Sequence, residues 1–293
     1  MDPKSKITVK EHPEFEEESK RLENTISAIM QEVVSKRSTG VQGGDRWATE
    51  NLKRYTVNRI SKYQDSVYNP YFGRVDFSVD GIEPKKIYYG YSALDLGDYE
   101  VVDWRAPVGK LFYGSNAEQQ SYIAPEGLIR GKLLLKRHIS IDFGDLVDIA
   151  DEVDRRPDKL SKAKMVSKES FLLQELYSRG DPRLQDIVKT IQEQQDRIIR
   201  APSQQTLVIN GVAGSGKTSI AYHRLAYLLY PDTTQGYLKA HNTIVFAPNR
   251  LFLSYVSNLL PQLGVKDVNQ VAFDDWARGF IRDETIAILE RET

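Results

Sequence analysis

Residues 206–230 read TLVINGVAGSGKTSIAYHRLAYLLY, and this stretch decides the fold of the C-terminal part of the chain. The apolar run 206–210 predicts a buried strand, and residues 218–230 predict a helix that ends at Pro231. Between them, Gly211–Thr218 matches the pattern G-x-x-x-x-G-K-[ST] of a phosphate-binding loop. A strand before the loop and a helix after it form the context that this motif requires. A glycine-rich turn that carries Lys-Thr by accident does not explain that context.

The residue types in the loop indicate how it would hold the phosphates of a nucleotide. Glycines allow consecutive backbone N–H groups to turn inward around a phosphate chain, and the following helix directs its positive dipole end at the same phosphates. Lys217 would reach the β- and γ-phosphates and the Thr218 hydroxyl would ligate magnesium, so both are predicted catalytic residues. The predicted nucleotide-binding residues of the loop are Gly211, Val212, Ala213, Gly214, Ser215, Gly216, Lys217, Thr218 and Ser219.

The segments around the loop alternate between strand and helix patterns. Residues 243–247 predict a second buried strand, and residues 250–260 predict another helix. This order predicts an α/β lobe with a parallel sheet and right-handed crossovers. Upstream, residues 166–178 and 184–200 predict two helices that a Gly-Asp-Pro break at residues 180–182 separates.

Helical periodicity dominates residues 11–69, where apolar side chains form two stripes. The stripes are Phe15, Leu22, Ile26, Ile29 and Val33, and then Leu52, Thr56, Ile60, Tyr63 and Val67. Residues 38–44 have the composition of a turn, and Asp45 is the predicted N-cap of the second helix. The pattern predicts an antiparallel helical hairpin over residues 1–69, with the stripes packed face to face. Periodicity favours a hairpin that only packs on the rest of the chain over a partner-binding prong.

Residues 70–145 predict a small antiparallel β-sheet, because short β-branched and aromatic runs alternate with glycine and proline. The expected strands are residues 75–80, 86–94, 99–104, 110–114, 120–124 and 133–143. The acidic stretch 142–158 lacks the spacing of a calcium loop, so it predicts a solvated linker. The predicted domains are the hairpin (1–69), the β-rich region (70–145), a linker with helices (146–185) and the first part of the α/β lobe (186–293).

The composition excludes several classes of protein. The 293 residues include 40 Lys and Arg against 41 Asp and Glu, which gives a formal net charge of −1 and no globally basic surface. The absence of cysteine excludes disulfides, iron–sulfur clusters and thiol nucleophiles, and the four histidines share no metal-ligand spacing. No run of 18 apolar residues and no signal peptide is found, so the sequence predicts a cytoplasmic protein without a membrane segment.

Residues 188–230 resemble the opening of a UvrD-like superfamily 1 helicase lobe. In that family a glutamine just before the first strand reads adenine, and Gln195 occupies this position here. The resemblance therefore implies a RecA-like lobe that binds ATP and magnesium. Residues 244–249 and 271–277 resemble the next two motifs, the first of which touches single-stranded DNA. The usual family pattern has a histidine where this chain has Asp274.

Residues 69–77 (NPYFGRVDF) and 102–108 (VDWRAPV) resemble signatures of the HelD branch of these helicases. The resemblance begins at about residue 66 and runs to the last residue, and the hairpin fits it in character. It implies a motor that binds core RNA polymerase with its hairpin in the secondary channel, and that uses ATP to release the polymerase from nucleic acid. DNA would be contacted through the motor lobe. The alternatives are a DNA helicase of repair or recombination, a small-molecule kinase and a non-enzymatic binding module.

Two parts of a superfamily 1 motor are missing from the sequence. Such a motor needs a strand-end acidic pair and an arginine from a second lobe. The run Val271–Asp275 is the one candidate for the acidic pair, but the family register favours a structural role for Asp274 and Asp275. We therefore expect an N-terminal portion of a longer ATP hydrolase, which binds MgATP weakly and hydrolyses it negligibly by itself.

Overall fold

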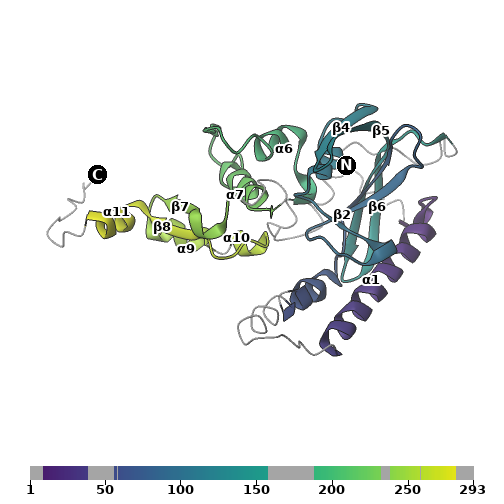
Figure 1. Ribbon diagram of the computed structural model, residues 1–293, viewed down its shortest axis with the longest axis horizontal. Coiled ribbons are helices and arrows are strands. Elements are labelled where there is room, and N and C mark those ends of the chain that lie inside the picture. Colours follow the sequence, from purple (N-terminus) through teal and green to yellow (C-terminus); the bar gives the residue numbers. More distant parts are fainter. Residues whose placement is uncertain are drawn as a thin grey trace, which may run out of the picture. The chain divides into compact units, whose positions relative to one another are not determined.

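The computed structural model describes residues 9–38, 56–57, 59–157, 188–231, 238–257 and 259–281 (Figure 1). The chain forms a mixed α/β structure of two compact units, Met1–Arg197 and Ile198–Thr293. Within the described ranges, no helix has the length and apolar character needed to cross a membrane.

The first unit contains a six-stranded sheet. Its strands are β1 (Gly73–Ser78), β2 (Lys85–Gly90), β3 (Val102–Asp103), β4 (Gln119–Ala124), β5 (Gly127–Asp142) and β6 (Asp145–Asp154). The order is β3-β2-β1-β5-β4, and β6 also pairs with β5. The long strand β5 pairs with β4 through residues 127–132 and with β6 through residues 135–142. Because β1 occupies the opposite edge of β5, β4 and β6 lie end to end along one edge.

The structure confirms a sheet in the region where the sequence predicted one, with two corrections. The β2–β3 pair is parallel, so the sheet is mixed rather than antiparallel. Residues 110–114 were expected to form a strand, but Lys110–Tyr113 is the short helix α3, which follows the 3-10 turn η3 (Pro107–Gly109). Three successive side chains of α3 are buried, a pattern that a strand with one solvent-facing side does not give. Pro107 starts the turn, where its missing N–H costs nothing.

The prediction of a linker from residue 142 is wrong, because residues 145–154 form strand β6. Its carboxylates find cationic partners inside the first unit. Arg137 on β5 holds Asp151, and Arg156 holds Asp154. The β-rich part of the chain therefore extends to residue 154. No group of three or more histidine or acidic side chains suited to a metal ion occurs among the described residues.

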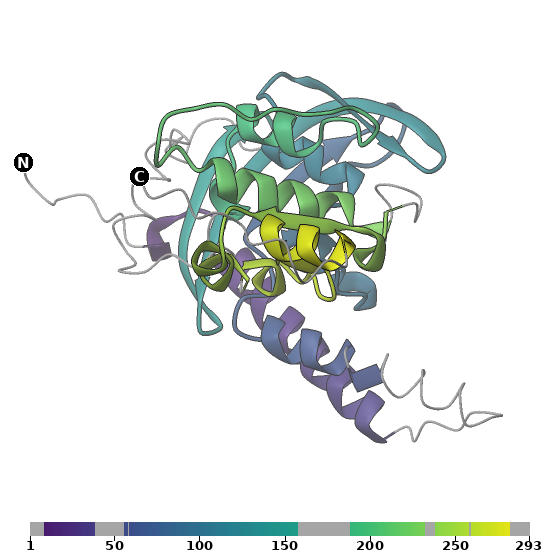
Figure 2. The same cartoon turned by 90° about the vertical axis from the view of Figure 1, so that its left-hand side faces the viewer.

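The helical hairpin is confirmed where the structure describes it. Helix α1 spans Phe15–Ser38, and residues 59–66 form a second helical segment beside it (Figures 1 and 2). The predicted turn after residue 38, Leu52 and Asp45 lie outside the described residues. The buried cluster at the hairpin contains Leu22, Ile29, Val33, Tyr63, Tyr71, Tyr88, Leu94, Val101, Ile139 and Ile141. Since the last six belong to the sheet region, the two helices pack on the sheet as well as on each other.

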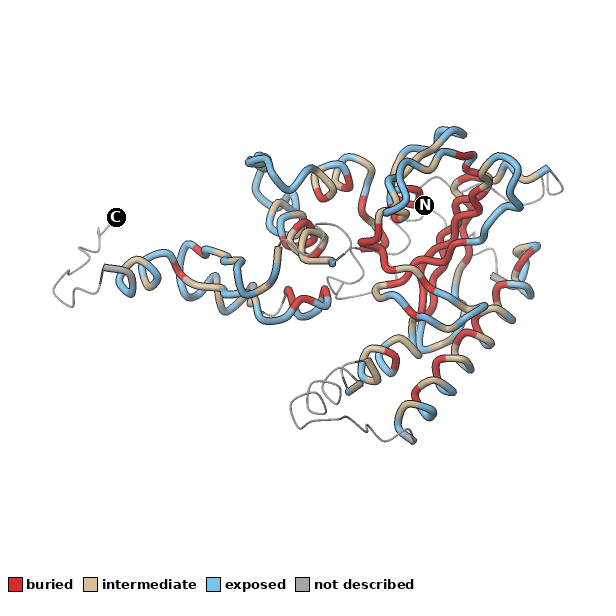
Figure 3. Tube along the Cα trace, in the orientation of Figure 1, coloured by how far each residue is buried: buried red, intermediate tan, exposed pale blue. Residues whose placement is uncertain are grey.

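The second unit is smaller and more exposed (Figure 3). Helix α6 (Glu193–Ile199) runs into it from the first unit. Its other elements are α7 (Lys217–Leu228), η5 (Ala240–Asn242), β7 (Ile244–Ala247), α9 (Arg250–Val256), α10 (Leu259–Gln262), β8 (Asn269–Ala272) and α11 (Phe273–Ile281). Strands β7 and β8 form a parallel pair, whereas the sequence predicted a parallel sheet from residues 206–210 and 243–247, so the predicted RecA-like sheet is not confirmed. The helix expected over residues 250–260 is divided into α9 and α10.

The strand expected over residues 206–210 is not formed. These residues have no strand partner, and Val208 is 85% exposed. A parallel strand is stable only when neighbours cover both of its faces, and the pair β7–β8 supplies no such cover to this segment. The predicted helix 184–200 is also interrupted, at Ile191 and Gln192, before α6 begins.

Candidate functional site

The loop Gly211–Thr218 has the backbone of an anion-binding turn. Gly214 and Gly216 adopt φ values of 77° and 80°, which residues with a side chain rarely adopt. The Ser215 N–H donates to the Val212 carbonyl at 3.3 Å, which closes the turn. Gly216 is the N-cap of the 12-residue helix α7, whose first N–H groups therefore open toward the loop.

Lys217 folds back over this loop. Its Nζ atom donates to the carbonyl oxygens of Gly211 at 2.9 Å and Val212 at 2.6 Å. Gly211 itself approaches Ser215 so closely that an added Cβ would lie 2.9 Å from the Ser215 hydroxyl. The structure thus brings together Lys217, the glycines and Ser215, while Thr218 is exposed at the start of α7. This short segment could therefore offer backbone N–H groups, an ammonium group and two hydroxyls to a phosphate chain.

Arg224, which the sequence reasoning did not single out, fixes the other face of α7. It lies two turns after Lys217 and is buried. Its Nη1 atom donates to the carbonyls of Ile198, Ile199 and Ala201 at 2.8–3.1 Å, and its Nη2 atom donates to the Pro202 carbonyl at 3.1 Å. A guanidinium at the C-terminal end of α6 satisfies carbonyls that the helix leaves unpaired. No sequence motif marks such a residue, because its partners are backbone atoms.

Gln195, the predicted adenine reader, belongs to the first unit, whereas the loop belongs to the second. Its side chain is half-buried near the start of α6. The Oε1 atom accepts a hydrogen bond from the Gln192 backbone N–H at 3.0 Å. This arrangement caps the helix N-terminus and gives the side chain one orientation.

The two segments that resemble DNA-contacting motifs lie together in the second unit. Residues 244–249 form β7 and the turn after it, in which the Asn249 side chain caps α9 by accepting from the Phe252 N–H at 2.7 Å. Residues 271–277 include the end of β8 and the first turn of α11. Asp275 accepts two hydrogen bonds from Arg250, at 2.6 and 2.8 Å, which links α11 to α9. This contact agrees with the structural role expected for Asp275.

A cluster of buried charged side chains lies where the hairpin meets the sheet. Glu18 of α1 is fully buried, and its Oε1 atom accepts from Arg74 and from Arg137, each at 2.8 Å. Its Oε2 atom accepts from the Tyr88 hydroxyl at 3.2 Å. Arg137 also holds Asp151 through two hydrogen bonds. The sequence carried a signal for this site, since Glu14 and Glu18 continue the spacing of the buried stripe through Leu22.

The buried charges change one another's pKa values. Burial raises the pKa of Asp151, but hydrogen bonds from Arg137 and His12 outweigh it and hold that pKa well below its usual range. For Glu152, burial is likewise outweighed by His138, whose Nε2 lies 2.8 Å away, and by Lys136, so its pKa falls to about 2. Burial and the charge of Glu18 raise the pKa of Tyr88, which therefore remains a hydrogen-bond donor.

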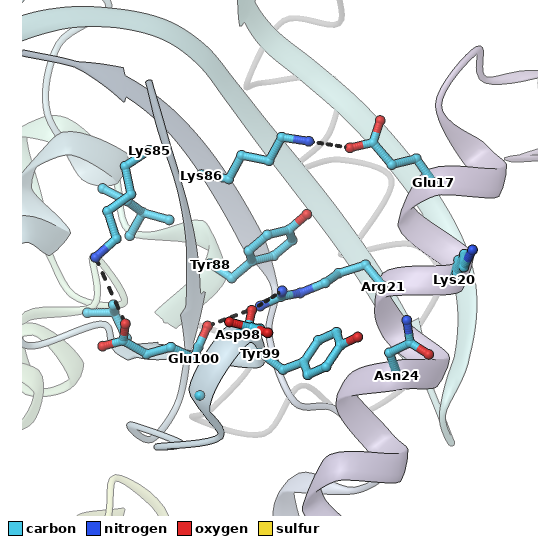
Figure 4. A pocket seen from close by; sticks show the side chains of 13 residues that line it. Glu17, Lys20, Arg21, Asn24, Lys85, Lys86, Tyr88, Asp98, Tyr99 and Glu100 are labelled. Carbon is cyan, nitrogen blue, oxygen red and sulfur yellow. Dashed lines mark hydrogen bonds and ion pairs between the residues drawn. The ribbon is translucent and has the colours of Figure 1, made fainter. Parts of the chain in front are cut away.

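A groove runs beside this cluster, between α1 and the segment Gly97–Glu100 (Figure 4). Arg21 crosses it from α1 and places its guanidinium 4.5 Å from the ring centroid of Tyr88 and 4.9 Å from that of Tyr99. The same group donates to the backbone carbonyls of Asp98 and Glu100 at 2.6 and 3.3 Å. These contacts fasten the outer face of α1 to the sheet.

A family model described as "DNA helicase IV HelD, N-terminal domain" matches residues 9–164. The chain belongs to the HelD family. The matched residues include α1, the whole six-stranded sheet and the buried cluster around Glu18, and they end before the loop at Gly211. A comparison with curated proteins found no significant match. The HelD resemblance inferred from residues 69–77 and 102–108 is therefore confirmed for the N-terminal part of the chain.

Proposed function

We propose that this chain is the front part of an ATP-dependent HelD-type motor that binds core RNA polymerase and helps to release it from nucleic acid. The observation that carries the proposal is the combination, in one chain, of a HelD N-terminal domain with a loop of the pattern G-x-x-x-x-G-K-T at the N-terminus of α7. A binding domain alone would not need that loop, and a free-standing ATPase would not need the hairpin.

In this proposal the second unit binds ATP and magnesium. Lys217 would leave the carbonyls of Gly211 and Val212 and contact the β- and γ-phosphates, and the exposed Thr218 hydroxyl would hold the metal. Gln195 would contribute its amide to the adenine edge. The residues Val212, Ala213, Gly214, Gly216 and Ser219 would supply backbone N–H groups and the helix terminus around the phosphates. Magnesium, when bound, would neutralise part of the negative charge of the phosphates.

The hairpin would be the part that reaches the polymerase. The apolar cluster and Glu18 attach the described part of the hairpin to the sheet. The hairpin would therefore enter the secondary channel as an extension with a fixed base. Deleting all of α1 would destroy the fold, because Leu22 and Ile29 are core residues. A test must therefore shorten the hairpin beyond Ser38 and keep its base.

The experiment is size-exclusion co-elution with core RNA polymerase. The native chain is compared with a variant in which residues 39–57 are replaced by a short Gly-Ser linker. We expect the native chain to co-elute and the shortened chain, folded by circular dichroism, to elute separately. Absence of binding by the native chain would contradict the proposed binding to RNA polymerase.

A DNA helicase acting in repair or recombination is the second candidate, and the family's own description as a DNA helicase favours it. Both candidates share the phosphate loop and the segments 244–249 and 271–277. Duplex unwinding by the full-length protein without polymerase would support this second function, and unwinding that requires polymerase would oppose it.

A further inference from the structure

The turn between β5 and β6 combines two features that are unfavourable in a β-hairpin. Strands β5 and β6 are joined by Phe143 and Gly144, and both residues have positive φ values, 49° and 87°. A turn with positive φ at both central residues favours asparagine and glycine, and a phenylalanine at the first position strains the backbone. The turn is also closed by Asp142 opposite Asp145, and like charges at paired positions repel.

The Phe143 side chain is not buried in exchange for this strain. It is 81% exposed, and its ring meets that of Tyr68 edge-on, 6.2 Å between centroids at 75°. Tyr68 is itself 59% exposed. The two rings therefore stand together in solvent at one end of the sheet.

Contacts with neighbouring segments of the chain hold the turn, and with it the aromatic pair, in place. The Gly144 N–H donates to the Tyr68 carbonyl at 2.9 Å. Gly144 lies beside Ile26 on α1, at a distance where an added Cβ would make an ordinary contact 3.5 Å long, and its φ of 87° favours glycine at this position. The aromatic pair therefore lies at the base of the helical hairpin, where the hairpin is attached to the sheet.

The charged residues that lie closest in the sequence to the two aromatic residues are acidic. Asp142 and Asp145 flank Phe143, Asp65 precedes Tyr68 by three residues, and all three are exposed. Residues 142–154 contain six acidic residues and no basic one. An exposed aromatic pair with an acidic rim complements an apolar pocket that is surrounded by lysine and arginine.

We infer that Phe143 and Tyr68 form a docking knob that inserts into a basic-rimmed apolar pocket on the RNA polymerase. An aromatic residue that is exposed at a strained backbone position indicates a surface with a role in binding. This inference rests on the proposed polymerase-binding function and adds to it a second contact at the base of the hairpin. Insertion would bury both rings, and a basic rim would relieve the repulsion between Asp142 and Asp145.

The decisive variant is Phe143→Asn in the full chain. Asparagine accepts the positive φ, so the melting temperature should be unchanged or higher, while the dissociation constant for core RNA polymerase should rise at least about tenfold. Asp145→Asn should weaken the salt dependence of binding without unfolding the protein. The matched control is Ile123→Asn, an exposed apolar residue on β4, which should change affinity less than about twofold.

The outcomes separate the two ideas. Native binding that Phe143→Asn leaves unchanged would overturn the docking knob and leave the polymerase proposal standing. A native chain that does not bind would overturn both. Dimers of the native chain that dissociate in Phe143→Asn, with unchanged polymerase binding, would assign the knob to self-association and also overturn the inference.

Discussion

Glu18 and Arg137 form a fully buried ion pair, 2.8 Å between Oε1 and Nη1, that joins helix α1 to the centre of strand β5. The two residues are 119 positions apart in the sequence. Arg137 also binds Asp151 on β6, so one guanidinium connects three elements of the first unit. Buried ion pairs, surrounded by apolar side chains, therefore fix the hairpin to the sheet.

Removal of the Glu18 carboxylate should severely destabilise the first unit. Glu18→Gln removes the negative charge that Arg74 and Arg137 share, and breaking a buried ion pair costs about 3–5 kcal/mol of unfolding free energy. Urea denaturation measures this loss. The adjacent and exposed Glu17 is the control, because Glu17→Gln should cost less than about 1 kcal/mol. Equal effects of the two variants would contradict the role given to the buried network.

The first unit should lose stability in acid. The pKa values of Asp151 and Glu152 are lower in the folded protein than in the unfolded chain, so their contribution is present above the unfolded pKa near 4 and is lost as pH falls. For Glu152, with a folded pKa of about 2, the contribution is about 3 kcal/mol. Urea midpoints measured from pH 7 to pH 2.5 should fall mainly below pH 4.5. Glu152→Gln should flatten that slope, and an unaltered slope would argue against this assignment.

The Lys217 side chain should be required for nucleotide binding and dispensable for folding. Its amine donates to the loop carbonyls of Gly211 and Val212, and Lys217→Ala removes the one ammonium group of the motif. We expect a fluorescent MgATP analogue to bind the variant at least about tenfold more weakly, with the melting temperature of the free protein preserved. Lys266→Ala, at an exposed lysine in the same unit, should bind as the native chain does. Equal affinities of all three proteins would remove the loop from the nucleotide site.

Arg224 should stabilise the second unit. Arg224→Ala removes the side-chain donor from four carbonyls at and after the end of α6, of which only that of Ile198 keeps a backbone N–H donor within the described part of the chain, so the change should cost about 2–4 kcal/mol of unfolding free energy. Hydrogen exchange of α7 amides measures the change locally. The exposed Arg278 serves as the control, since Arg278→Ala should leave exchange of α7 unaffected. Undiminished protection in Arg224→Ala would show that the carbonyls are satisfied by water.

Features with a local cause were predictable from the sequence. The stripe Leu22–Val33 buries one face of α1 because apolar residues recur at helical spacing, and the phosphate loop turns where its glycines allow positive φ. The order of strands and helices placed residues 243–247 in a parallel sheet with residues 206–210, but the structure pairs β7 with β8 instead. The helix α3 was missed because a short run of apolar residues does not distinguish a buried helix from a strand.

Which charged residues are buried and which are exposed depends on tertiary contacts. The acidic stretch 142–158 has the composition of a linker, yet Asp151 is a core residue because Arg137 stands opposite it on β5. Conversely, the run 206–210 has the composition of a buried strand and stays exposed without neighbours. Local periodicity specifies which face of an element is apolar. Whether a charge or an apolar run is buried depends on partners distant in the chain, which the sequence of that element does not contain.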